Sequence, residues 1–326
     1  MRPGDVLFGG GPEPVVLPVC DHYAGREAMI RKSLALQAEL GPVFDVTADC
    51  EDGAEVGRER EHAEMVGEML RCADNRFDRL GVRIHDPGHH SWHTDIELVI
   101  RAAGERLAFV TIPKVDGFEA VDRVVNAIDD VCSQNGVRRE IPVQVLIETH
   151  GALREVQAIA SHPRVECLAF GLMDYVSAFN GAVPASAMAS PGQFEHPLVR
   201  RAKTEVSVGA HAAGKVPAHN VCVNIGEPEA AGADARRAAV EYGFTRMWSI
   251  HPSQVRPIVA ALTPEPGAIQ TACEILMAAQ SARWGPIRHG DRLQDRASYR
   301  YWWGLLRRAR AAGAAVPAEA LSTLFH

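Results

Sequence analysis

The sequence predicts an α/β fold, a closed parallel (β/α)8 TIM barrel with a C-terminal helical appendage. Short apolar or β-branched segments recur along the chain, and each is followed by a segment of helical periodicity. Eight such units occur before the pattern changes, which is the number that a closed barrel needs. A length of 326 residues also suits one barrel domain with insertions.

The short apolar segments are the predicted strands. They cover residues 15–19, 44–49, 79–84, 107–114, 143–148, 165–171, 216–223 and 246–252. Between them, segments such as 25–40 and 118–132 carry apolar residues at steps of three and four, which is typical of amphipathic helices. The chain is 47% hydrophobic but only 6% aromatic, so we expect an interior of Ala, Val, Leu and Ile, as in strands buried on both faces.

The pattern changes after the eighth predicted strand. A break rich in Pro and Gly precedes a helix at 272–284, a loop at 285–295 and a final helix at 299–312, with no strand candidate among them. We therefore expect a catalytic barrel domain at 1–262 and a helical extension at 263–326.

The extension contains a cluster of large apolar side chains beside several arginines. Its members are Tyr301, Trp302, Trp303, Leu305 and Leu306. Contact with a membrane is one interpretation of this cluster. Packing against the barrel or a neighbouring subunit is the favoured one, because two helices cannot bury their apolar faces alone. The expected assembly is a homo-oligomer, a trimer or a multiple of one.

Composition excludes several classes of protein. The formal net charge of -7 argues against a nucleic-acid partner. The seven cysteines are scattered, odd in number and never in a CxxC pair, which argues against a disulfide framework or a zinc cage. Neither a secretory signal nor a membrane-spanning segment is evident, so we expect a cytoplasmic protein without a membrane partner.

Polar residues follow the predicted strands at their C-terminal ends, where the reacting groups of such barrels lie. They are Asp49, Glu51 and Asp52 after the second strand, Arg83 in the third, Lys114 in the fourth, Glu148 in the fifth, Asp174 after the sixth and His251 in the eighth. Because parallel strands end at the same face of a barrel, these side chains should meet at one mouth.

Carboxylates gathered at such a mouth repel one another unless a cation or a shared proton compensates them. Glu148 and Asp174 follow adjacent strands and would offer two oxygen ligands to Mg²⁺, with water and substrate completing its shell. Zinc is less favoured, because no His pair or thiolate accompanies them. The alternative is a purely structural pairing with Arg83 or Lys114; for Asp49 and Glu51 that alternative is at least as good.

Arg83 and Lys114 are the two cations of the predicted mouth. A partly buried guanidinium beside a metal is suited to an anionic substrate, because its planar donors match carboxylate and enolate oxygens. Lys114 could suggest a Schiff base, but the surrounding acids should keep it protonated. His251 precedes a proline and is expected to be structural.

The same residues form motifs similar to those of the superfamily that contains the citrate lyase β-subunit, malyl-CoA lyase and the HpcH/HpaI aldolases. The resemblance spans nearly the whole chain. Its D-x-E-D motif resembles residues 49–52, V-R-[IV]-N resembles 82–85, P-K resembles 113–114, I-E-[TS] resembles 147–149, F-G-x-x-D resembles 170–174, and G-F followed by I-H-P-x-Q resembles 243–244 and 250–254.

The resemblance implies roles for several residues. Glu148 and Asp174 would bind Mg²⁺, with Mn²⁺ as a second possibility, and Arg83 would hold the oxo-acid portion of the substrate; Lys114, in the P-K motif, would also lie at the substrate. Residues 290–295 resemble a degraded form of the loop that in malyl-CoA lyase-like members carries an acid/base Asp into the neighbouring subunit's site. Asp295 is therefore a candidate catalytic residue.

Two departures from the family pattern concern the coenzyme. Residues 17–23 stand where L-[FY]-V-P-G-x-x-P is usual and lack its Gly and basic character, and Met247 stands where the family has a Lys before the last strand. Both departures weigh against coenzyme A binding and leave the metal site unaffected.

The expected reaction is reversible aldol or Claisen cleavage of a hydroxyacyl-CoA, with Arg83 and the metal stabilising oxyanions and Asp52 or Asp295 as the base. One alternative is an aldolase that acts on free oxo-acids such as pyruvate or oxaloacetate, which needs no nucleotide pocket. The other is a non-catalytic ligand-binding barrel within a larger complex, which the intact Glu148, Asp174 and Arg83 disfavour.

Overall fold

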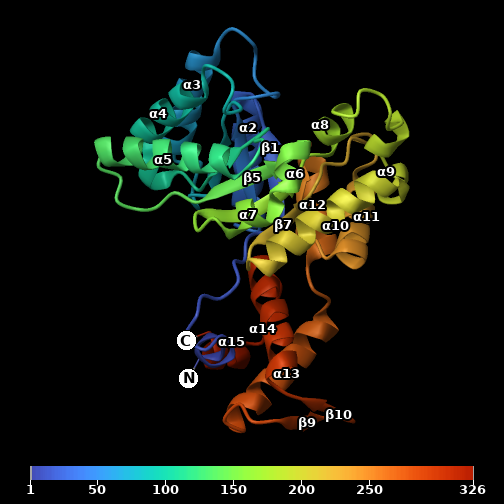
Figure 1. The fold of residues 1–326 in the computed structure, drawn as a ribbon. Coiled ribbons are helices and arrows are strands. Elements are labelled where there is room, and N and C mark those ends of the chain that lie inside the picture. Colours follow the sequence, from blue (N-terminus) through green and yellow to red (C-terminus); the bar gives the residue numbers. More distant parts are fainter. Residues whose placement is uncertain (1, 326) are drawn as a thin grey trace.

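The computed structural model describes residues 2–325 and contains a closed barrel of eight parallel strands (Figure 1). The strands are β1 (Cys20–Ala24), β2 (Phe44–Asp49), β3 (Leu80–Arg83), β4 (Val110–Ile112), β5 (Val143–Ile147), β6 (Val165–Phe170), β7 (Val216–His219) and β8 (Arg246–Ser249). They pair in sequence order, and β8 pairs with β1 to close the ring. The predicted (β/α)8 barrel is thus confirmed.

Helices surround the barrel and join its strands. They are α2 (Glu27–Leu40), α3 (Glu59–Arg71), α4 (Trp92–Ala103), α5 (Phe118–Gln134), α6 (His150–Arg154), α7 (Val156–Ser161), α8 (Leu172–Ser177), α9 (Gly192–Glu195), α10 (Pro197–Ala212), α11 (Pro228–Tyr242) and α12 (Pro252–Leu262), with short 3-10 turns at Gly104–Arg106 and Ala185–Met188. The main core lies between these helices and the strands and is rich in Val, Ile, Leu and Ala, as the composition predicts.

The first strand does not lie where it was predicted. Residues 15–19 are not a strand, and β1 is the more polar segment Cys20–Ala24 that follows them. Pro18 cannot donate a ladder hydrogen bond. The polar side chains of β1 find partners on the neighbouring strands: Asp21 accepts from Thr47 Oγ1 of β2 at 2.8 Å, and His22 Nδ1 lies 2.8 Å from Ser249 Oγ of β8.

A buried ion cluster crosses the barrel interior below its mouth. Arg246 on β8 is fully buried and contacts Asp21 on β1 at 3.1 Å and Asp45 on β2 at 2.7 Å. It also donates to the Pro18 carbonyl at 2.6 Å. Burial raises the pKa of Asp21 to about 6 despite the neighbouring guanidinium. Arg246 therefore joins three strands and the entering chain by charge-assisted contacts.

The C-terminal residues form a separate layer beneath the barrel (Figure 1). This extension contains α13 (Pro266–Ser281), β9 (Ile287–His289), β10 (Arg292–Gln294), α14 (Arg296–Ala311) and α15 (Ala318–Leu324). The loop predicted at 285–295 is wrong in part, because β9 and β10 pair there as an antiparallel hairpin that turns at Gly290 with a φ of 58°. Each of its strands has three residues, which is too short for a periodic pattern to be recognised in the sequence.

The extension has an apolar core of its own, in which helix α1 (Pro3–Leu7) takes part. Leu7 packs with α13, α14 and α15, and Glu13 contacts Trp303 Nε1 and Arg307 Nε at 3.0 and 3.1 Å. Trp303 and Leu306 of the predicted apolar cluster are buried here. The extension thus buries part of its apolar surface together with α1, a helix outside residues 263–326, while Tyr301 of the same cluster stays exposed.

Two further expectations concern membrane-spanning segments and the cysteines. Within residues 2–325, no helix is both long and apolar enough to pass through a bilayer. All seven cysteines have free thiols, and six of them are buried, as the scattered spacing predicts.

Candidate active site

The loops that follow the strands meet at the upper end of the barrel in Figure 1 and enclose a cavity of about 170 Å³. It is lined by Tyr23, Asp49, Asp52, Arg83, Glu148, Phe170, Gly171, Leu172, Met173, Asp174, Asn220, Val221, Trp248 and Ile250. Residues from β1, β2, β3, β5, β6, β7 and β8 or their following loops thus reach one mouth, as parallel strands dictate.

Arg83 is held in this mouth by two carboxylates. Its Nε and Nη2 donate to the two oxygens of Asp49 at 2.8 and 2.6 Å, and its Nη1 lies 2.8 Å from Glu51 Oε2. Asp49 also accepts the backbone N–H groups of Glu51 and Gly53. Burial opposes ionisation of Asp49, but Arg83 and these donors hold the pKa of the carboxyl below its usual value. Asp49 is thus a positioning partner of Arg83.

Lys114 lies beside the same carboxylates. Its Nζ is 2.5 Å from Glu51 Oε1 and 3.1 Å from Asp52 Oδ1. Burial lowers the pKa of Lys114, but contact with Glu51 outweighs it and raises the pKa above its ordinary value. This direction agrees with the expectation that the amine is protonated and unsuited to Schiff-base formation.

Glu148 and Asp174 line the same cavity, after the ends of β5 and β6. Glu148 is 2% exposed, whereas the side chain of Asp174, in the first turn of α8, is 39% exposed. Burial and the neighbouring charge of Asp174 raise the pKa of Glu148 to about 8. One Glu148 oxygen accepts the backbone N–H of Lys114 at 2.8 Å, which the left-handed backbone of Lys114 (φ 49°) presents to it.

Gly171 leaves the space that the Glu148 carboxylate occupies. A Cβ added at Gly171 would lie 2.1 Å from Glu148 Oε2. Two neighbouring carboxylates, one of them buried and fitted into a glycine cradle, are a donor set suited to a hard divalent cation. Two oxygen ligands leave the remaining positions of such an ion to water and substrate oxygens, as Mg²⁺ prefers.

The opposite wall of the mouth is aromatic. The rings of Tyr23 and Trp248 stack at 4.6 Å between centroids, and the guanidinium of Arg83 lies 5.4 Å from the Tyr23 ring. Neither aromatic residue was predicted. Tyr23 was obscured by the misplaced first strand, while Trp248 carries no polar signal that would distinguish it from core.

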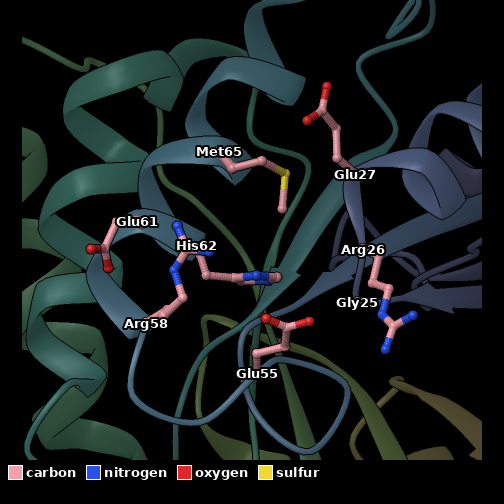
Figure 2. A pocket seen from close by; sticks show the side chains of 8 residues that line it. All are labelled: Gly25, Arg26, Glu27, Glu55, Arg58, Glu61, His62 and Met65. Atoms are coloured by element: carbon pink, nitrogen blue, oxygen red, sulfur yellow. The ribbon is translucent and has the colours of Figure 1, made fainter.

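A second cavity, of about 290 Å³, lies beside the mouth between the loops after β1 and β2 (Figure 2). Figure 2 shows Arg26 and Arg58 on its rim, Glu55 between them and the ring of His62 pointing inward. His62 Nε2 lies 2.8 Å from the Asp49 carbonyl, which ties this cavity to the mouth.

The position of β1 corrects one of the two departures concerning the coenzyme. Because β1 ends at Ala24, the residues that follow the first strand are Gly25 and Arg26, so this loop has both a Gly and a basic residue. Gly25 is required there, since an added Cβ would lie 1.9 Å from the Gly53 carbonyl oxygen. Met247 is buried on β8 and offers no charge.

Four predicted residues do not line the cavity of the mouth: Glu51, which lies beside it and pairs with Arg83, Lys114, which pairs with Glu51, and Asp295 and His251. Asp295 is the N-cap of α14, where its side chain accepts from the backbone N–H groups of Ala297 and Ser298. The extension that carries it lies at the opposite end of the barrel from α8 in Figure 1, so this chain's Asp295 does not meet its own mouth. His251 caps α12 through Ser253 N, in agreement with its expected structural role.

Comparison with known proteins shows which family this chain resembles. The model of the family described as HpcH/HpaI aldolase/citrate lyase matches residues 29–252. A crystal structure of a citrate lyase from Burkholderia xenovorans LB400 is 54% identical, with a TM-score of 0.86, and covers 100% of both chains. The L-malyl-CoA/beta-methylmalyl-CoA lyase of Cereibacter sphaeroides is 27% identical over 319 residues, which are 93% of each chain.

A third comparison concerns the fold alone. The protein CitE from Mycobacterium tuberculosis, in complex with magnesium, acetoacetate and coenzyme A, is 20% identical, with a TM-score of 0.67, over 91% of this chain and 99% of that one. A family match over most of the sequence, together with the closed barrel and its acidic mouth, leads to one conclusion. The chain belongs to the HpcH/HpaI aldolase/citrate lyase family and is a carbon–carbon lyase.

Proposed function

We propose that this lyase is Mg²⁺-dependent and catalyses aldol- or Claisen-type cleavage, or the reverse condensation, of a hydroxyacyl-CoA of the malyl, citramalyl or citryl thioester type. The observation that carries the proposal is the pairing of Glu148 and Asp174 beside Arg83 in one cavity. Carboxylates that repel each other next to a held guanidinium suit an oxo-acid bound to a divalent cation. The substrates in the names of the full-length relatives support the thioester.

Arg83 would bind the oxo-acid portion of the substrate. Asp49 and Glu51 take up part of its N–H donors and fix the plane of the guanidinium. The remaining N–H groups are available for a carboxylate and for the carbonyl oxygen that forms as the carbon–carbon bond breaks. Because the group is already oriented by Asp49, it needs little reorganisation as negative charge develops.

Glu148 and Asp174 would hold Mg²⁺, which when bound acts as a Lewis acid toward the substrate oxygens. A base must accept the hydroxyl proton while the bonding electron pair passes to the acyl fragment as its enolate. Asp52 is one candidate in this chain, since its side chain is 56% exposed at the mouth. Asp295 of a neighbouring subunit is the other.

The coenzyme portion of the substrate would extend toward the cavity of Figure 2. Arg26 and Arg58 offer cationic groups for phosphate there, and the loop of Gly25 leads directly from β1 into it. This cavity adjoins the mouth through His62 and Asp49. One subunit would then bind both the reacting end of the thioester, in the mouth, and its phosphate groups, in this cavity.

A second candidate, an aldolase that acts on free oxo-acids, is favoured by a different observation. Glu27, Glu55 and Glu61 line the same cavity and oppose phosphate binding, and Met247 supplies no charge. An enzyme of this kind would use Arg83 and the metal pair in the same way but need no coenzyme site.

A screen of substrates separates the two. Malyl-CoA and citramalyl-CoA would be compared with free malate, citramalate and hydroxy-oxo-acids in the presence of Mg²⁺, with product oxo-acid as the readout. We expect turnover of a thioester, with a raised KM in the Arg26→Gln variant. Turnover of free acids alone, unaffected by Arg26→Gln, would establish the aldolase instead.

A further inference from the structure

A third cavity lies at the end of the barrel opposite the mouth, between the barrel and helix α14 of the extension. Its walls are the chain that enters β1, the turn between α10 and β7, and one face of α14. Its volume is about 420 Å³, which is within the range of small-molecule sites. It shares no lining residue with the mouth or with the cavity of Figure 2.

The side chains around this cavity are strongly biased in charge. Five of its lining residues are basic and none is acidic, although the whole chain has a formal charge of -7. The basic residues are His211, Lys215, Arg300, Arg307 and Arg308. Such a concentration of one sign in a partly enclosed space attracts anions.

The guanidinium of Arg308 has the most telling environment of the five. Its Nε is buried and has no hydrogen-bond partner in the described structure, whereas Arg307 is paired with Glu13. Burial without an acidic partner lowers the pKa of Arg308 below its ordinary value, and only Tyr301 opposes this effect. Nε itself is closed to the cavity, so an anionic ligand would contact the terminal N–H groups of this guanidinium, for which the described residues offer no acidic partner.

The rest of the lining is apolar. Val15 and Leu17 close the barrel interior from below, and together with Val16, Leu305 and Phe8 they give the cavity a hydrocarbon wall beside its cations. A molecule with an apolar body and an anionic group would match both parts at once.

Gly304 contributes to the open space of the cavity. It lies in the interior of α14 and lines the cavity, yet a Cβ added there would meet no atom within 4 Å. Glycine in a helix interior costs roughly 0.5–1 kcal/mol relative to alanine. No close approach of a neighbour requires glycine at this position, so a larger side chain there would extend into the open space of the cavity.

We propose that this cavity is a binding site for an amphiphilic anion, a short alkyl chain that ends in a carboxylate or a phosphate. Arg308, with Arg300 and Lys215, receives the anionic group, and the chain lies on Val16 and Leu305. The site is separate from the lyase centre and joins the barrel to the extension, so the ligand contacts both.

The test is calorimetric titration of the full-length protein with octanoate and octyl phosphate. Octanol and inorganic phosphate serve as probes that lack one half of the ligand. We expect both anionic amphiphiles to bind, and each incomplete probe to bind at least tenfold more weakly. The Arg308→Gln variant should lose affinity by about tenfold or more, whereas Arg296→Gln, on the same helix but outside the cavity, should bind as the wild type does.

The Gly304→Leu variant tests the site without removing a charge. Leucine would fill the open space and favour the helix, so this variant should retain its fold or gain thermal stability while losing the ligand. Undiminished binding to Gly304→Leu or Arg308→Gln, equal binding of octanol or inorganic phosphate, or no binding of either amphiphile would overturn the proposal. The Gly304→Leu result decides the matter even if Arg308→Gln fails to fold.

Discussion

Glu148 combines deep burial with a carboxylate neighbour, and this combination makes its ionisation depend on what is bound beside it. Its pKa is raised from 4.5 to about 8, so near neutral pH the metal-free protein holds a proton there. A metal ion requires the ionised form and must displace that proton. Metal binding and proton release at Glu148 are therefore coupled.

The first prediction concerns this coupling. Apparent affinity for Mg²⁺ should rise by about tenfold for each pH unit up to about pH 8 and then level off, because one proton must leave Glu148. Titration calorimetry in buffers of different ionisation enthalpy would measure the proton release. Glu148→Gln should abolish binding and turnover, while Glu119→Gln, an exposed control on α5, should change neither.

The same pKa shift has a stability consequence in the absence of metal. A carboxyl whose pKa is raised on folding stabilises the native state below the unfolded value of 4.5, and this contribution is lost as pH rises toward 8. The free energy of unfolding of the metal-free protein, measured by urea titration, should therefore fall between pH 4.5 and about pH 8. A Glu148→Gln variant that loses as much over the same window would show that another group is responsible.

Arg83 gives the third residue-level prediction. Arg83→Lys keeps the charge next to Asp49 but loses the planar fork, so the fold should survive while turnover falls by roughly 10²-fold or more. Steady-state kinetics would measure kcat and KM separately. A rise in KM with kcat unchanged would mean that Arg83 binds substrate and transition state equally.

The sequence predicted which residues gather at the mouth better than it predicted their environments. Arg83, Lys114 and Glu148 follow from the strand ends, because parallel strands finish on one face. The left-handed backbone of Lys114 and its bond to Glu148 do not follow, since both depend on the path of a loop. Asp49 shows the same limit, as only coordinates reveal that it holds Arg83.

At the level of the elements, the metal pair depends on Gly171, the single residue that joins β6 to α8. Gly171→Ala should push the Glu148 carboxylate aside, because the new Cβ would lie 2.1 Å from its Oε2 and 2.5 Å from its Cβ. We expect Mg²⁺ affinity to fall at least tenfold with far-UV circular dichroism unchanged. Gly267→Ala, where an added Cβ meets nothing within 4 Å, is the matched control.

The strands show where pattern-based prediction works and where it fails. Every strand from β2 to β8 overlaps its predicted range, because strands buried on both faces are continuous apolar segments. β1 was missed because its polar Asp21 and His22 are satisfied on neighbouring strands by partners distant in sequence. The β9–β10 hairpin was missed for a different reason, since strands of three residues carry too little periodicity.

At the level of the whole molecule, the position of the extension makes sharing of the active site testable. Asp295→Asn keeps the N-cap of α14, because asparagine caps helices as well as aspartate does, but removes the carboxylate. If Asp295 serves a neighbouring subunit, turnover should fall by about 10²-fold or more while Mg²⁺ affinity stays unchanged. Sedimentation would establish the expected homo-oligomer.

Mixing variants sharpens this prediction. Hetero-oligomers of Asp295→Asn and Asp174→Asn chains should recover part of the activity, since some sites would combine an intact Asp174 from one chain with an intact Asp295 from the other. Verified hetero-oligomers without recovered activity, or a fully active monomer, would limit the extension to a structural role.

The cluster of Arg246 with Asp21 and Asp45 restricts how this barrel can change over evolutionary time. Arg246 is the shared cation of both aspartates, so replacing it alone would take the guanidinium away from two buried carboxylates, at a cost of about 3–5 kcal/mol. That is a large share of the stability of an ordinary domain. Arg246 is therefore expected to change only together with Asp21 and Asp45, so sequence divergence in this lineage should be slow at the barrel floor.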